Sequence, residues 1–77
     1  MQAIEISKLL SARPFEPLVV QLNDGRSFEI RRPGMAIVTP DILAIGLPRS
    51  NGSRLAERIV RCSIADIAQV EPVASAQ

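Results

Sequence analysis

The spacing of hydrophobic residues near the start of the chain predicts a short helix. Ile6, Leu9 and Leu10 stand at positions i, i+3 and i+4, so they share one face of a helix over residues 3–12. Pro14 disfavours helical geometry at the residue before it, and another proline three positions on keeps the next residues extended. We therefore expect the helix to end at a rigid proline elbow.

The pattern changes to strict alternation at residue 18, which predicts a β-hairpin. Leu18, Val20 and Leu22 point to one side of a strand, and the residues between them point to the other. The pair Asp24-Gly25 follows, and it is a strong hairpin signal because glycine accepts a positive φ. We expect a return strand over residues 27–32, ended by the Pro-Gly pair that comes next.

The middle of the chain predicts a third strand that is strongly bent. Residues 35–39 fit a strand, Pro40 and Asp41 interrupt it with turn chemistry, and residues 42–47 resume it. The resumed run does not alternate, and a strand that is apolar on both sides must be covered on both sides. A chain this short offers only its N-terminal helix or another subunit as the second cover. The expected interface consists of Ile42, Leu43, Ile45 and Leu47.

Residues 55–62 fit two kinds of secondary structure. Leu55, Ile59 and Cys62 have helical spacing, whereas the last four residues of this segment also alternate as a strand does. We favour the strand, in which Val60 and Cys62 face inward and Ile59 faces outward.

The remaining segments are loops, a last strand and a tail. Residues 48–53 form the clearest flexible loop, residues 63–66 a tight turn, and residues 67–71 the last short strand. Residues 73–77 show no pattern, and we expect them to form a disordered tail. Residues 1–72 are therefore expected to form a single domain.

Two stretches resemble the signature segments of Sm-like proteins. Residues 18–26, Leu-Val-Val-Gln-Leu-Asn-Asp-Gly-Arg, resemble the family's first strand and hairpin, and residues 58–64, Arg-Ile-Val-Arg-Cys-Ser-Ile, resemble its second signature. The resemblance implies a mainly β fold: a short N-terminal helix, then a small, strongly bent five-stranded antiparallel barrel of the Sm-like or SH3-like kind. Cys62 replaces the usual glycine of that signature, and Asp41 is followed by Ile42 where the family has an asparagine. Because these two positions hold the RNA base contacts of Sm-like proteins, the resemblance supports the barrel better than it supports RNA binding.

A second resemblance concerns the elbow and the hairpin. Residues 12–17, Ala-Arg-Pro-Phe-Glu-Pro, and the Asp-Gly-Arg turn at residues 24–26 are similar to a group of short, uncharacterised bacterial proteins with the same helix, elbow and hairpin. This likeness covers roughly half of the chain. It implies a bacterial protein and carries no known activity with it.

Length and composition restrict the class of protein further. At 77 residues the chain has room for one core, and small domains without disulfides or metal ions often gain burial by association. Apolar residues make up 47% of the chain, but the longest apolar run falls far short of the roughly 20 residues of a membrane span. The single cysteine excludes an internal disulfide, and an acid stands where a secretory signal has basic residues. We expect a cytoplasmic protein without membrane contact that forms a homo-oligomer or binds a protein partner.

The side chains that most enzymes use are missing from the sequence. Without histidine, the serines lack their usual activating base, and the acids form no cluster for a divalent cation. Asp41 and Asp66 fit an acid–base pair or, alternatively, turn aspartates that bond to their own backbone. Cys62 fits a reactive thiol beside Arg61 or a small buried apolar residue. We expect no enzyme activity, no cofactor and no metal ion.

Nucleic-acid binding is the alternative function. The net charge of +1 is far from that of a dedicated nucleic-acid binder, but one segment concentrates arginines. The expected phosphate-binding rim consists of Arg49, Arg54, Arg58 and Arg61. The same residues also fit a solvated edge that discourages strand pairing, while Phe15 and Phe28 fit base-stacking platforms or core residues. Our first expectation is a non-enzymatic binding or scaffolding module, and the alternative is an RNA- or DNA-binding regulator.

Overall fold

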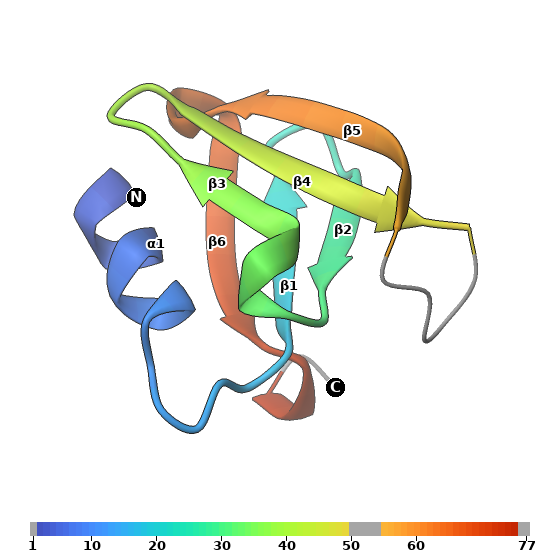
Figure 1. The fold of residues 1–77 in the computed structure, drawn as a ribbon. Coiled ribbons are helices and arrows are strands. Elements are labelled where there is room, and N and C mark those ends of the chain that lie inside the picture. Colours follow the sequence, from blue (N-terminus) through green and yellow to red (C-terminus); the bar gives the residue numbers. More distant parts are fainter. Residues whose placement is uncertain (1, 50–54, 76–77) are drawn as a thin grey trace.

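The computed structural model describes residues 2–49 and 55–75, which form one helix and two three-stranded antiparallel sheets (Figure 1). The main elements are α1 (Ala3–Leu10), β1 (Leu18–Leu22), β2 (Ser27–Ile30), β3 (Ala36–Val38), β4 (Ile42–Pro48), β5 (Ala56–Ser63) and β6 (Ile67–Pro72). Short 3₁₀ turns lie at Pro33–Met35, Ile64–Asp66 and Val73–Ser75. The strand order is β2-β1-β6 in the first sheet and β3-β4-β5 in the second.

The hairpin between β1 and β2 forms where alternation and the Asp-Gly pair predict it. Gly25 has a φ of +92°, which L-residues with a side chain rarely adopt. The backbone N–H of Leu22 donates to the carbonyl oxygen of Arg26 at 2.8 Å, and the Asp24 carboxylate accepts from the N–H of Arg26 at 3.0 Å. In β1 the residues alternate between buried and half-buried, as their hydrophobicity does. The predicted first strand and turn are confirmed, and the return strand is confirmed with its end two residues earlier than expected, at Ile30.

The expected bent third strand is in fact a second hairpin. Thr39 closes a tight turn: its backbone N–H donates to the Ile42 carbonyl oxygen at 2.8 Å, and its Oγ1 accepts from the Ile42 N–H at 3.0 Å. The chain therefore reverses at Pro40 and Asp41, and β3 pairs antiparallel with β4. Among the described residues there are six strands in two sheets, and no strand pairing joins these sheets into the closed five-stranded barrel that we expected.

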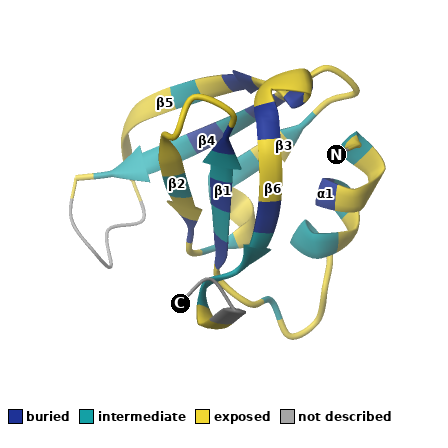
Figure 2. Cartoon of the chain, turned by 180° about the vertical axis from the view of Figure 1, so that it is seen from behind, coloured by how far each residue is buried: buried dark blue, intermediate teal, exposed yellow. Residues whose placement is uncertain are grey.

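The core lies between the two sheets, and α1 contributes one buried residue to it. Figure 2 shows buried positions alternating with half-buried ones along β1, while β6 has buried residues at Ile67 and Val70 with exposed residues between them. The buried apolar residues are Ile6, Leu18, Val20, Leu22, Ile30, Leu43, Ile45, Cys62, Ile64, Ile67 and Val70. Phe15 and Phe28 pack against this cluster, which confirms their interpretation as core residues.

Several other expectations can be compared with the described residues. The strand interpretation of residues 55–62 is confirmed, and the helix is confirmed with its end two residues earlier than expected. Residues 73–75 form a 3₁₀ turn, and the Val73 N–H donates to the Pro17 carbonyl oxygen at 2.9 Å, so this part of the expected disordered tail is ordered. Most of the expected loop at residues 48–53 lies outside the described residues, as do residues 76 and 77. No helix in the described part of the chain has the length and apolar character needed to cross a membrane.

Candidate interaction surface

Two of the four residues expected at an interface belong to the core. The side chains of Leu43 and Ile45 are fully buried, and Leu47 is half-buried on the same side of β4. The physical reason is that β4 is the middle strand of its sheet and turns these positions toward the first sheet of the same chain. The prediction that Leu43 and Ile45 contact a partner is therefore wrong, because no second subunit is needed to cover them.

The opposite side of the same sheet exposes apolar side chains to solvent. Ile37 on β3 pairs with Ala44 on β4, and Ile59 on β5 pairs with Gly46 on β4. Ile37 and Ile59 are 68% and 66% exposed, and Ile42 at the start of β4 is 41% exposed. We call these five residues, Ile37, Ile42, Ala44, Gly46 and Ile59, the apolar face.

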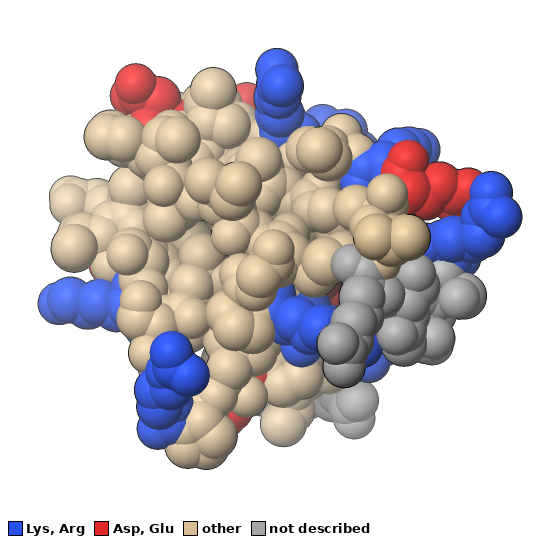
Figure 3. All heavy atoms as spheres, in the orientation of Figure 1, with Lys and Arg blue, Asp and Glu red and all other residues tan. Residues whose placement is uncertain are grey.

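Most charged side chains on this side of the molecule lie at its margin. The viewer of Figure 3 looks onto β3 and β4, where a broad area without lysine, arginine, aspartate or glutamate is bordered by basic and acidic side chains, with basic atoms also just right of the centre. Isolated exposed hydrophobic residues are normal on protein surfaces, whereas a contiguous apolar area with a polar margin is typical of a contact site. Of the surface that residues 2–49 and 55–75 form, the apolar face therefore most resembles an interface.

The centre of the apolar face is closely packed. A Cβ atom placed on Gly46 would lie 3.1 Å from the Cβ of Ala56 and 3.4 Å from the Cε of Met35. Glycine at this position allows Met35 and Ala56 to come together over β4. The middle strand thus presents small residues between Ile37 on one neighbouring strand and Ile59 on the other.

The arginines of the expected rim do not form one patch. Arg49 pairs with Glu57 at 3.2 Å, and Arg54 lies outside the described residues. Arg58 is opposite Leu47 and Arg61 is opposite Ala44, so their side chains leave opposite faces of β5. Neither Arg58 nor Arg61 makes an ion pair with any residue that the structure describes. Arg61 stands on the side of the sheet that carries the apolar face.

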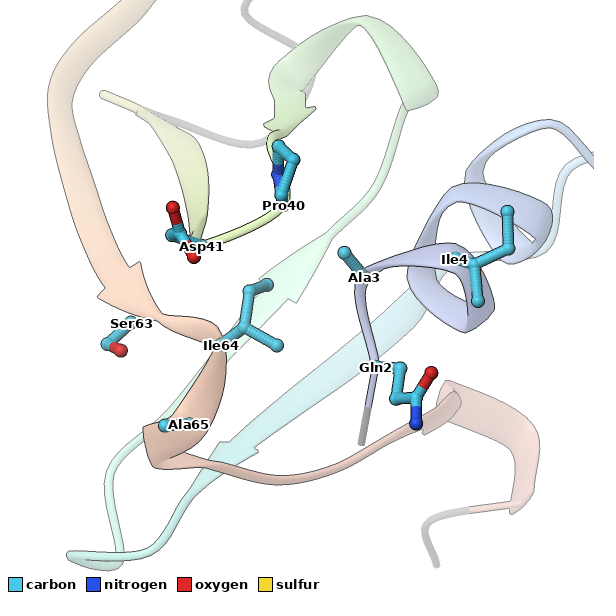
Figure 4. A pocket seen from close by; sticks show the side chains of 8 residues that line it. All are labelled: Gln2, Ala3, Ile4, Pro40, Asp41, Ser63, Ile64 and Ala65. Atoms are coloured by element: carbon cyan, nitrogen blue, oxygen red, sulfur yellow. The ribbon is translucent and has the colours of Figure 1, made fainter.

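A shallow hollow of about 560 Å³ lies where the start of α1 meets two turns (Figure 4). Residues 2–4, Pro40, Asp41 and residues 63–65 line it, and Asp41 is exposed there. Asp66 lines a different hollow. The structure does not bring the two aspartates into one site, which favours the interpretation of both as turn residues.

The second hollow, of about 250 Å³, is polar and lies between the β1–β2 hairpin and the end of β5. Its wall includes Cys62, whose thiol is buried. Burial raises the pKa of this thiol, the Arg26 guanidinium lowers it, and the carboxylates of Asp66 and Asp24 raise it again. The thiol is thus predominantly protonated at neutral pH, which favours its interpretation as a small apolar core residue.

The Asp24 carboxylate in the same wall is held in its charged form. The backbone N–H of Arg26 bonds to it at 3.0 Å and the Arg26 guanidinium at 2.8 Å. These contacts lower the pKa of Asp24, the backbone bond having the larger effect. No group of three metal-ligating side chains occurs within residues 2–49 and 55–75.

Neither family models nor curated proteins match this sequence, and no solved structure matches its fold. Of the apolar face, our sequence reasoning singled out only Ile42 and missed Ile37 and Ile59 as contact residues. The sequence did indicate that Ile59 is exposed, because the strand interpretation of residues 55–62 places its side chain on the outer face.

Proposed function

We propose that this chain is a non-enzymatic binding module that docks on a protein chain through its apolar face. The observation that carries this proposal is the exposure of Ile37 and Ile59 on two different strands of one sheet face. A partner that covers both side chains gains hydrophobic free energy without rearrangement of the domain.

The size of this gain follows from the exposed fractions. Full burial of an isoleucine side chain is worth about 1.5–3 kcal/mol. Because about two thirds of Ile37 and of Ile59 is exposed, covering both contributes about 2–4 kcal/mol. This corresponds to an affinity gain of about 30- to 1,000-fold.

The positions of the groups suited to acid–base or nucleophilic chemistry are consistent with a binding role. Asp41 and Asp66 line separate hollows, and the Cys62 thiol is buried with a raised pKa. None of these three groups lies on the apolar face.

The test compares the wild type with a variant that carries Ile37→Gln and Ile59→Gln. Ile4→Gln is the matched control, because Ile4 is 59% exposed but lies on α1. Light scattering reports self-association at high micromolar concentration, and affinity capture from bacterial lysate reports a different partner. We expect association that the double variant loses and the control keeps. A strictly monomeric wild type that captures no protein dependent on these isoleucines would contradict the proposal.

Nucleic-acid binding is the second candidate, and the unpaired Arg58 and Arg61 favour it. Their side chains leave opposite faces of β5, which disfavours contact of both with one phosphate backbone. In addition, this chain lacks the RNA-contacting residues of the Sm-like proteins that its sequence resembles. Titration of mixed oligonucleotides at low salt tests this candidate against a variant with Arg58→Ala and Arg61→Ala. Absence of binding by the wild type at low salt would exclude it.

A further inference from the structure

We propose that the partner of the apolar face is a segment of a different protein that combines apolar side chains with a carboxylate, and that this carboxylate pairs with Arg61. The inference rests on the proposed function and adds the chemistry of the partner. The guanidinium of Arg61 is the cation beside the exposed isoleucines.

The register places Arg61 in a row with two residues of the apolar face. Arg61 pairs with Ala44, and Ala44 pairs with Ile37 on its other side. Neighbouring strands lie about 4.8 Å apart, so the backbone positions of Ile37 and Arg61 are about 10 Å apart. Ile59 is two residues from Arg61 on the same side of β5. A segment that covers Ile37 and Ile59 therefore reaches Arg61.

Within the described residues, Arg61 and Arg58 both lack an ion pair, and of these two only Arg61 lies on the side of the sheet that carries the apolar face. Asp24 and Asp66 line the same hollow as Arg61 but form no ion pair with it. Arg26, Arg31 and Arg49 each have a carboxylate oxygen within 3.2 Å. Arg61 makes no ion pair or side-chain hydrogen bond within the described part of the chain. Its charge is satisfied by solvent as long as this side of the sheet stays uncovered.

A partner that covers the isoleucines removes solvent from the guanidinium. An unpaired charge at the edge of a buried contact is costly, whereas a carboxylate forms short, charge-assisted and often bidentate hydrogen bonds with arginine. A second copy of this chain is a poor occupant, because it brings a second Arg61 to the contact while Glu57, the acid of β5, already pairs with Arg49. The complementary surface is apolar and acidic.

A random 12-residue peptide library displayed on phage tests this inference with the intact protein. Peptides are selected on the wild type and counter-selected on the variant with Ile37→Gln and Ile59→Gln. The same library is also selected on Arg61→Glu and, as the matched control, on Arg58→Glu. Arg58 is an unpaired arginine of the same strand whose side chain leaves the other face.

We expect wild-type selection to enrich apolar residues together with aspartate or glutamate. The Arg61→Glu protein should enrich lysine or arginine in place of the acid, and Arg58→Glu should retain the wild-type preference. A synthesised peptide from the wild-type selection should lose about 10- to 100-fold in affinity on Arg61→Gln, because one hydrogen-bonded charge pair is lost.

The possible failures are distinguishable. Peptides that need Ile37 and Ile59 but show no acidic preference, or keep their preference on Arg61→Glu, overturn this inference and leave the proposed function standing. A homodimer that depends on the same isoleucines likewise overturns this inference and leaves the proposed function standing. Absence of any peptide that depends on the isoleucines, together with a monomeric protein, overturns both.

Discussion

Replacement of Leu43 by alanine tests whether β4 turns this side chain into the core. Leu43 is fully buried, whereas Ile37 on the adjacent strand is 68% exposed on the other face of the sheet. Truncation of a buried leucine costs about 2–5 kcal/mol through lost transfer energy and a residual cavity. The total stability of a 77-residue domain is about 4–12 kcal/mol, so Leu43→Ala removes a large part of it. Ile37→Ala should cost less than about 1 kcal/mol.

The assay is equilibrium unfolding in urea, followed by circular dichroism, for the wild type and both single variants. We expect a much lower midpoint for Leu43→Ala and a nearly unchanged midpoint for Ile37→Ala, with similar slopes. In thermal unfolding, the loss for Leu43→Ala should lower the Tm by about 8–40 °C. Equal costs for the two variants, or a Leu43→Ala cost below about 1 kcal/mol, would refute the described orientation of β4.

Substitutions at Gly46, Cys62 and Asp24 test the packing and the ionisation of single side chains. Gly46→Ala should destabilise the domain by about 1 kcal/mol in thermal unfolding, because the new Cβ lies 3.1 Å from the Cβ of Ala56 and the β5 backbone must shift to relieve this contact. Gly34→Ala meets open space and should stay within about 0.5 kcal/mol. Equal costs for the two variants would contradict the packing. Burial raises the pKa of Cys62, so the folded state keeps the thiol proton to higher pH than the unfolded chain does. The urea midpoint of the wild type should therefore fall as the pH rises above about 8.5. The midpoint of Cys62→Ala should lack this fall. The pKa of Asp24 is lowered in the folded state, so the charged carboxylate stabilises the fold above the usual aspartate pKa of about 3.9. This contribution should be lost as the pH falls through the pKa of the folded state. The stability of Asp24→Asn should depend less on acidic pH, and a profile of stability against pH identical to that of the wild type would contradict the contacts of Asp24.

The local structure was predictable wherever one short-range pattern dominated. Alternation over residues 18–22 and the positive φ required at Gly25 determine the first hairpin without help from the rest of the chain. The second hairpin was missed because its turn at Pro40 and Asp41 lacks the usual glycine. Its closure depends on the Thr39 side chain, whose role is visible only once β3 and β4 are paired.

The position of the contact surface was not predictable from the apolar run alone. Residues 42–47 are apolar on both sides of the strand, and hydrophobicity does not tell which side meets the core. Burial of Leu43 and Ile45 depends on the packing of the first sheet against β4, a contact between distant parts of the chain. The exposure of Ile37 could not be predicted, because the alternation in a strand of three residues is too short to assign its two faces.

The proposed contact between the apolar face and another chain can be tested residue by residue. Its most direct test is a methyl NMR titration of protein labelled at the isoleucine δ1 carbons with a peptide from the wild-type selection. The signals of Ile37, Ile42 and Ile59 should shift in proportion to binding, while that of Ile4 should stay in place. Binding that shifts Ile4 and leaves the other three signals unmoved would contradict the proposed contact.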